Sequence, residues 1–208
     1  MGEIWGIILA AGESKRMHSP KMLLPWNGRT IIESVVENVG ASLIDGSVIV
    51  LGSCSEQIQK VTGHLAVNHV FNNNFTEGML SSVQCGFRSL EDKVSAAIIF
   101  LGDQPAIRKE IINLLIEAYR KSGKGIIMPV FKGRRGHPLL VDTRYRNDIL
   151  KLDPQTGLKT LQMSFPSDVL EVETDDNFVL KDIDTRKDYH DMLNQITKNN
   201  GRDYSIYP

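Results

Sequence analysis

Residues 4–21 read Ile-Trp-Gly-Ile-Ile-Leu-Ala-Ala-Gly-Glu-Ser-Lys-Arg-Met-His-Ser-Pro-Lys. The first part of this stretch, 4–10, is a nearly continuous apolar run, which is typical of a strand that is buried on both faces. The second part is a polar loop that contains Gly12 and ends near Pro20. A strand covered on both faces needs helices above and below it, so this stretch favours a parallel α/β sheet.

Strand-like and helical patterns alternate along most of the chain, which predicts a Rossmann-like three-layer α/β/α fold with a mostly parallel sheet and right-handed crossovers. Thr30 is expected to cap one helix, because Glu33 follows it at capping-box spacing. The strands that follow the first are expected at 48–51, 67–71, 96–101 and 125–130, and the helices at 30–39, 55–61, 79–90 and 107–120. Short strands at 139–141, 169–172 and 178–183 predict a mixed C-terminal edge, before a closing helix at 185–196.

Composition narrows the class of protein. The 24 basic and 25 acidic residues of this 208-residue chain nearly cancel, which argues against a nucleic-acid-binding protein. No apolar run reaches the roughly 20 residues needed to span a membrane, and the start lacks a signal-peptide pattern. Cys54 and Cys85 stand alone, which excludes a disulfide framework and a CxxC motif. We therefore expect a cytoplasmic protein with a single domain over 1–197 and a polar tail over 198–208.

Ligands of open α/β sheets bind outside the carboxyl ends of the strands, so the loops there are the places to search. In the first loop, the turn at Ala11 and Gly12 lets backbone N–H groups approach an anion, and Arg16 and Lys21 add two positive charges suited to a polyphosphate. The loop is not a Walker A motif, and no GxGxxG occurs in the chain. The alternative is a tight turn whose basic side chains are only solvated.

Carboxylates follow two of the later predicted strands. Asp103 follows the apolar run 96–101 after Gly102, at the carboxyl edge of the sheet, where it could hold Mg²⁺ against substrate phosphates. It could instead cap the helix that begins after Pro105. Asp182 and Asp184 share one face of the last predicted strand, and either could supply a second carboxylate to the metal. The alternative there is that Asp184 or Thr185 caps the final helix.

Four motifs in order resemble the MobA/MocA-like nucleotidyltransferases. They are Leu-Ala-Ala-Gly-x-Ser-x-Arg-Met at 9–17 with Lys21, Gly-Asp-Gln-Pro at 102–105, Gly-His-Pro at 136–138 and Asp-Ile-Asp-Thr-x-x-Asp-Tyr at 182–189. Within that group the chain looks most like the molybdenum cofactor cytidylyltransferases, including those that serve xanthine dehydrogenase maturation. The resemblance runs from about residue 4 to 196. It departs at His18, because relatives usually have glycine after the Arg-Met pair.

The resemblance implies transfer of CMP from CTP to the terminal phosphate of the molybdopterin cofactor, with Mg²⁺ as cofactor and pyrophosphate as the second product. The catalytic residues would be Lys21, Arg16 and Asp103, and Asp103 and Asp184 would bind the metal. The acceptor would lie near His137 and Pro138, with Lys132, Arg134 and Arg135 as a basic approach, although this segment could equally be a solvated hairpin. The nucleotide-binding residues would be Leu9, Ala10, Ala11, Gly12, Gly78, Ser82 and Gly102.

The chemistry asked of such a site is mainly electrostatic. A phosphate monoester is mostly ionised at pH 7, because its second pKa lies near 6, so it needs no general base. The difficulty is bringing two polyanions together, which positioned cations overcome. Three other functions remain open: a guanylyltransferase for the same cofactor, a nucleotidyltransferase for a sugar or alcohol phosphate, and a carrier without catalysis. A molybdenum-containing dehydrogenase such as xanthine dehydrogenase is the expected protein partner.

Overall fold

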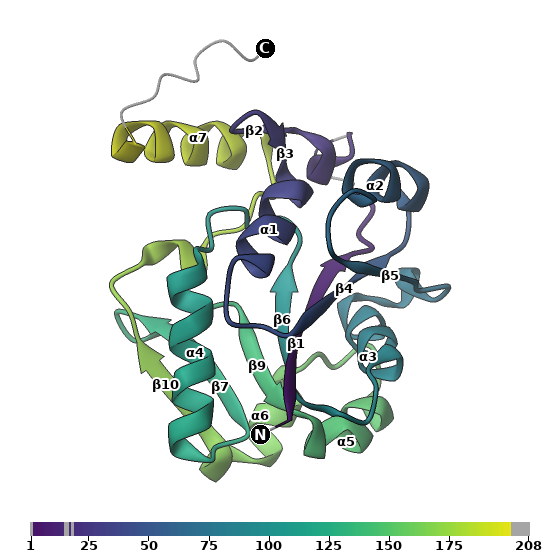
Figure 1. Cartoon of the computed structure of the whole chain (residues 1–208), viewed down its shortest axis with the longest axis vertical. Helices are drawn as coiled ribbons and strands as arrows, with labels where there is room; N and C mark the ends of the chain where they lie inside the picture. The colour runs from purple at the N-terminus through teal and green to yellow at the C-terminus, as the bar shows by residue number, and fades with distance from the viewer. Residues whose placement is uncertain (1, 15–16, 18, 201–208) are drawn as a thin grey trace.

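The computed structural model describes residues 2–14, 17 and 19–200 (Figure 1). Its centre is an eight-stranded sheet with strand order β10-β7-β9-β6-β1-β4-β5, and β8 pairs with β7 outside this order. The strands are β1 (Glu3–Ala10), β4 (Gly46–Leu51), β5 (Asn68–Phe71), β6 (Val94–Leu101), β7 (Ile126–Phe131), β8 (Arg134–Arg135), β9 (Leu139–Asp142) and β10 (Val169–Glu173).

Most neighbouring strands of this sheet run parallel, as predicted. Strand β1 pairs parallel with β4 on one side and with β6 on the other. Strand β9 is antiparallel to both of its neighbours, β6 and β7. The antiparallel strand therefore lies inside the C-terminal half of the sheet, and β10, which pairs parallel with β7, forms the edge.

Helices cover both faces of the sheet, which gives the three layers of the predicted Rossmann-like class. The helices are α1 (Ile31–Gly40), α2 (Ser55–Thr62), α3 (Met79–Ser89), α4 (Lys109–Ser122), α5 (Arg146–Lys151), α6 (Lys159–Ser164) and α7 (Arg186–Asn200). Ile4 and Ile8 of β1 pack into one buried cluster with α1, α2 and α4. Ile7 and Leu9 face the other way, into a second cluster with α3, α5 and α6. This alternation follows from the two-residue period of a strand.

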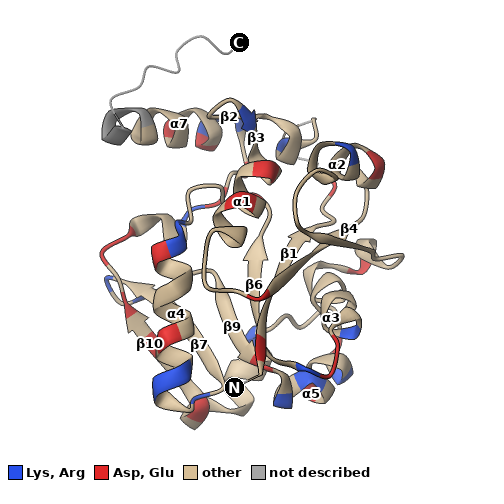
Figure 2. Ribbon diagram, in the orientation of Figure 1, with Lys and Arg blue, Asp and Glu red and all other residues tan. Residues whose placement is uncertain are grey.

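Charged residues lie mostly on helices and loops, and the central strands are largely free of them (Figure 2). One of the predicted helix starts is present in detail: the Thr30 hydroxyl accepts from the Glu33 N–H, and the Glu33 carboxylate accepts from the Thr30 N–H. Such a capping box contributes about 1 kcal/mol. No helix in the described part of the chain is long and apolar enough to cross a membrane.

The strand predicted at 178–183 is wrong. The structure has a 3-10 turn, η6 (Asn177–Leu180), followed by irregular backbone. The Asp176 side chain accepts from the Phe178 N–H at 2.9 Å, and the Lys181 N–H closes the turn onto the Phe178 carbonyl at 3.1 Å. These local bonds replace a strand ladder.

Further features differ from the sequence prediction, which did not include helices α5 and α6. A hairpin of β2 (Pro25–Trp26) and β3 (Arg29–Thr30), which the pattern did not predict, precedes α1. Helix α7 continues to Asn200, and the remaining part of the predicted tail, 201–208, lies outside the described residues.

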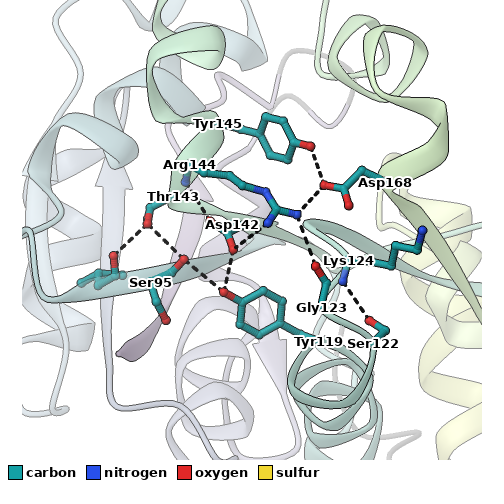
Figure 3. A network of polar contacts seen from close by, with 11 residues as sticks. Ser95, Tyr119, Ser122, Gly123, Lys124, Asp142, Thr143, Arg144, Tyr145 and Asp168 are labelled. Carbon is teal, nitrogen blue, oxygen red and sulfur yellow. Dashed lines mark hydrogen bonds and ion pairs between the residues drawn. The ribbon is translucent and has the colours of Figure 1, made fainter. Parts of the chain in front are cut away.

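A polar network ties elements together at the edge of the sheet where β6 begins and β9 ends (Figure 3). The Tyr119 hydroxyl donates to the Asp142 carboxylate at 2.8 Å, and the Thr143 hydroxyl donates to the Ser95 carbonyl at 3.0 Å. Burial and the hydrogen bond to Asp142 raise the pKa of Tyr119 to about 12. This network joins α4 to β6 and β9 at the edge away from the carboxyl end of β6.

Candidate active site

The site begins where β1 and β6 end side by side. Leu9 and Leu101 are in register, and the Gly102 N–H donates to the Leu9 carbonyl at 3.0 Å. A Cβ at Gly102 would lie only 2.8 Å from the Leu9 carbonyl oxygen and 2.9 Å from the Met22 sulfur. Glycine therefore lets the loops after the two strands run in contact, which brings the first loop beside Asp103.

The first loop folds back on itself. Ser14 has a positive φ of 52°, its carbonyl accepts from the Met17 N–H at 3.0 Å, and its hydroxyl accepts from the Lys21 N–H at 3.2 Å. These bonds return the chain to the sheet edge, so that the 3-10 turn η2 (Lys21–Leu23) begins there. Arg16 and His18 lie outside the described residues, so the role expected for Arg16 stays a prediction.

Lys21 is held between two carboxylates. Its Nζ lies 2.5 Å from Asp103 Oδ2 and 3.1 Å from Asp184 Oδ1, and the side chains are 12%, 13% and 26% exposed, respectively. Burial alone would lower the pKa of Lys21, but the charges and hydrogen bonds of Asp103 and Asp184 outweigh it and raise the pKa above its ordinary value. The lysine is therefore a fixed positive charge at this edge, and the reading of a merely solvated side chain is wrong.

Neither aspartate serves as the helix cap considered above. Helix α4 begins at Lys109 with Arg108 as its N-cap residue, so Asp103 does not cap it. At the start of α7, the Thr185 hydroxyl accepts from the Asp188 N–H at 3.2 Å, and the Asp188 carboxylate accepts from the Thr185 N–H at 2.8 Å. Thr185 is the cap there, which leaves Asp184 turned toward Lys21.

Asp103, Asp182 and Asp184 form a group in which one carboxylate oxygen from each lies within 4.8 Å of the others. Asp103 Oδ1 is buried and has no hydrogen-bond partner in the described part of the chain. Loss of solvent around Asp182, the most exposed of the three, and the nearby charges of Asp184 and Asp103 raise its pKa. A buried acceptor without a partner, beside crowded carboxylates, fits a divalent cation such as Mg²⁺. The structure brings both Asp182 and Asp184 to this group.

A cavity of about 360 Å³ opens beside this group. Leu9, Ala11, Gly12, Gly78 and Ser82, all predicted to bind the nucleotide, line it. Ala10 and Gly102 do not: Ala10 packs into the core on the α1 face, and Gly102 lies against Leu9. The full lining consists of Leu9, Ala11, Gly12, Glu13, Lys21, Met22, Phe75, Thr76, Gly78, Met79, Ser82, Leu101 and Asp103.

Behind the wall of the cavity at the start of α3 lies Asn72, a residue that sequence reasoning missed. Gly78 precedes α3 with a φ of 114°, which glycine tolerates best. Behind it the Asn72 amide donates to the hydroxyls of Ser81 and Ser82, at 2.9 and 3.0 Å. The available signal was the position of Asn72 directly after the apolar end of β5, at the same edge of the sheet as Ala11 and Asp103.

A second cavity of about 450 Å³ adjoins the first, because Leu9, Met79 and Leu101 line both. His137 lines it, and His137 Nδ1 is buried with no partner among the described residues. Burial lowers the pKa of His137, and the charge of Asp182 opposes this only in part.

The basic segment before His137 is a hairpin, and only part of it reaches the second cavity. Arg135 lines the cavity and is paired with Glu171 at 2.6 Å. Lys132 and Arg134 are exposed and do not line it, and neither does Pro138, which is buried.

Comparison with known proteins matches residues 6–169 to the family described as the MobA-like NTP transferase domain. Nicotine blue oxidoreductase of Paenarthrobacter nicotinovorans is 26% identical over 91% of this chain and 96% of that protein. Molybdenum cofactor cytidylyltransferase of Escherichia coli K12 is 25% identical over 91% of this chain and 95% of that protein. The crystal structure of Rv0371c from Mycobacterium tuberculosis H37Rv superposes with a TM-score of 0.84 at 23% identity, over 93% of this chain and 98% of that one; a manganese complex of the same protein is also solved.

Proposed function

Since the chain belongs to the family of MobA-like NTP transferase domains, which makes it a nucleotidyltransferase, we propose that it transfers CMP from CTP to the terminal phosphate of the molybdopterin cofactor. The observation that carries this proposal is the position of Lys21, held by Asp103 and Asp184 at the wall of a cavity formed by the first loop and the start of α3. That arrangement suits a triphosphate whose α-phosphate is attacked next to the lysine.

The residues present match the demands of the reaction. The acceptor phosphate is already ionised at neutral pH, so no side chain has to remove a proton from it. Lys21 stabilises the negative charge that grows on the departing pyrophosphate, and the N–H groups of the first loop orient the phosphates. The Ala11–Gly12 turn lines the cavity, which supports a role for its backbone in binding the phosphates.

The three neighbouring aspartates form the expected metal site. Asp103, Asp184 and Asp182 would hold Mg²⁺, which supplies charge neutralisation between the two polyanions when bound. A manganese complex of Rv0371c, a protein of similar fold, is also in line with the use of a divalent ion. The unpartnered Asp103 Oδ1 is the feature of this chain that favours it most.

The acceptor is assigned to the second cavity. Its lining includes the buried apolar side chains of Met128 and Leu158 and the exposed basic side chains of Arg135 and Lys159. An apolar lining with basic side chains suits a flat ring system that carries a phosphate. His137 lines the second cavity, and the charge of Asp182 acts on it. This supports an acceptor phosphate that lies between the two cavities.

Preference for CTP rests on two features of the sequence that resemble the cytidylyl branch of the family: Ala11 in the first loop and the Gly-Asp-Gln-Pro motif at 102–105. The similarity to the E. coli cytidylyltransferase supports it. The recipient of the product would be a molybdenum-containing dehydrogenase such as xanthine dehydrogenase. The cytoplasm is the compartment in which we place the reaction.

The proposal is tested by a panel of CTP, GTP, UTP and ATP, each mixed with Mg²⁺ and one acceptor, with pyrophosphate release as the readout. The acceptors are molybdopterin cofactor, a sugar 1-phosphate and an alcohol phosphate. We expect fastest release with CTP and the cofactor. Equal or faster release with GTP would favour a guanylyltransferase, and release with a sugar or alcohol phosphate would favour that substrate class. Binding of the cofactor without pyrophosphate from any nucleotide would indicate a carrier.

A further inference from the structure

A buried group of polar side chains stands behind the nucleotide cavity at the start of α3. Asn72, Ser81 and Ser82 are only 5%, 4% and 4% exposed. The orientation of the Asn72 amide is determined by its contacts: Oδ1 accepts from the Asn74 N–H at 3.0 Å, so the nitrogen faces the two serines. The amide then donates one proton to Ser81 Oγ and the other to Ser82 Oγ, at 2.9 and 3.0 Å.

The two serines differ in where their own protons go. The Ser81 hydroxyl donates to backbone carbonyls, since Gly78 O lies at 2.8 Å and Asn74 O at 2.9 Å. For Ser82, the amide of Asn72 is the one hydrogen-bond partner among the described residues, and it is a donor. The Ser82 oxygen is thus already accepting, and its own proton remains for a ligand. Ser82 lines the nucleotide cavity, whereas Ser81 does not.

We propose that Asn72 is a positioning residue that fixes Ser82 as a hydrogen-bond donor to the nucleoside, so that the site selects a ligand with an acceptor oxygen at that point. This inference rests on the proposed function, because it places the nucleotide in this cavity. Ser82 lines the cavity together with Phe75, Thr76, Gly78 and Met79, a segment separate in the chain from Lys21 and Asp103, to which the phosphates are assigned. Ser82 therefore faces the nucleoside, where the acceptor is a base carbonyl or a ribose hydroxyl.

Because Ser82 donates the hydrogen bond to the nucleoside, the site selects nucleotides that offer an acceptor at that point. The Ser82 proton has no acceptor among the described residues, so a ligand that offers only a donor or a hydrogen at that point leaves this buried proton unpaired. Loss of the bond is expected to weaken nucleotide binding by about tenfold. We expect the same loss of nucleotide affinity when Asn72 is changed so that it no longer donates to Ser82.

The experiment measures the Kd of CTP by calorimetry, with Mg²⁺ present, for the wild-type protein, three single variants and the double variant Asn72→Asp/Ser82→Ala. Ser82→Ala removes the donor. Asn72→Asp places a carboxylate where the amide donates, so the Ser82 proton turns toward it and away from the ligand. Ser81→Ala is the matched control: it lies on the same helix, is equally buried and leaves the other Asn72 proton unpaired, but it is outside the cavity.

We expect Ser82→Ala and Asn72→Asp to raise Kd about tenfold each and the double variant to raise it no further, because both changes remove one interaction. Ser81→Ala should stay within about twofold of wild type, although its melting temperature falls with those of the other variants. An equal rise in Kd for Ser81→Ala would show that the group acts only through folding. Additive effects of Asn72→Asp and Ser82→Ala would show that Asn72 does not act through Ser82.

Analogues of the nucleotide identify the acceptor. The wild type is compared with Ser82→Ala for CTP lacking the 2-carbonyl oxygen, 2′-deoxy-CTP and 3′-deoxy-CTP. One analogue should bind about tenfold more weakly to the wild type and lose nothing further in Ser82→Ala. Equal penalties in both proteins for every analogue would overturn the inference and leave the proposed function intact. Failure of the wild type to bind any nucleoside triphosphate would instead contradict the proposed function.

Discussion

Lys21 Nζ lies 2.5 Å from Asp103 Oδ2, although the two residues are 82 positions apart in the chain. The contact joins the end of the first loop to the end of β6, and it holds a positive charge in place before any substrate arrives. A charge positioned in this way costs little reorganisation when negative charge develops on a phosphate. The first predictions therefore concern this pair.

Lys21→Met is expected to lower kcat by about 10²–10³-fold, because it removes a preorganised cation from the departing pyrophosphate. The effect should appear in kcat as well as in KM, since loss of ground-state binding alone would change only KM. Steady-state kinetics with pyrophosphate detection measures both.

Lys181→Met is the control for Lys21→Met. Lys181 lies next to Asp182 in the sequence, but its ammonium donates to Gln195 at 2.6 Å and makes no ion pair with the three aspartates among the described residues. The Lys181→Met variant should retain nearly full activity. Equal losses in the two variants would mean that the site needs only diffuse positive potential, and no loss in either would mean that the phosphates bind elsewhere.

Asp103→Asn is expected to abolish turnover almost completely while the protein remains folded, because the change keeps the shape of the side chain and removes one charge from the metal site. The melting temperature in the absence of substrate reports folding. Activity within a few-fold of wild type would exclude a role for Asp103 in holding the metal.

Asp184→Asn should raise the Mg²⁺ concentration needed for half-maximal activity more than Asp182→Asn does. Asp184 touches Lys21 at 3.1 Å, whereas Asp182 is the most exposed of the three carboxylates. Titration of activity with Mg²⁺ compares the two. A larger rise in this Mg²⁺ concentration for Asp182→Asn would mean that Asp182 contributes more to the metal site than Asp184 does.

Tyr119→Phe tests the polar network at the opposite end of the sheet, where β6 begins and β9 ends. Folding raises the pKa of Tyr119 from 10.0 to about 12, so its contribution to stability is fully present below pH 10 and is lost as the pH rises toward 12. At neutral pH the variant should be less stable by about 1 kcal/mol, through loss of the bond to Asp142. Urea unfolding measures the difference in the free energy of unfolding between the two proteins, which should shrink above pH 10. A difference that does not depend on pH would contradict the raised pKa of Tyr119.

Much of the fold is predictable because the pattern at each decisive place is local. The apolar run before Ala11 and the run before Asp103 identify strands, and the carboxyl ends of parallel strands share an edge, so the meeting of the first loop with Asp103 follows from the sequence. Thr30 and Glu33 form the capping box that their spacing predicts.

The remaining features depend on contacts that spacing does not encode. The segment 178–183 has the apolar content of a strand, but the Asp176 side chain closes a turn there. The insertion of β9 between β6 and β7 depends on a pairing distant in sequence, and so does the choice of Lys21 as the partner of Asp184. The sequence does not single out Asn72, because the hydrogen bonds that its amide donates go to serines nine and ten residues away.

Lys21 and the aspartates are proposed to serve transfer of CMP to the molybdopterin cofactor. To test this, wild-type protein in excess is mixed with CTP, Mg²⁺ and the cofactor, and the products are identified by mass spectrometry. We expect one pyrophosphate for each cofactor that gains a CMP group, and neither product should be formed by Lys21→Met on the same time scale. Pyrophosphate without a CMP-bearing cofactor, or a CMP-bearing cofactor formed equally fast by Lys21→Met, would exclude the proposed reaction or the role of Lys21 in it.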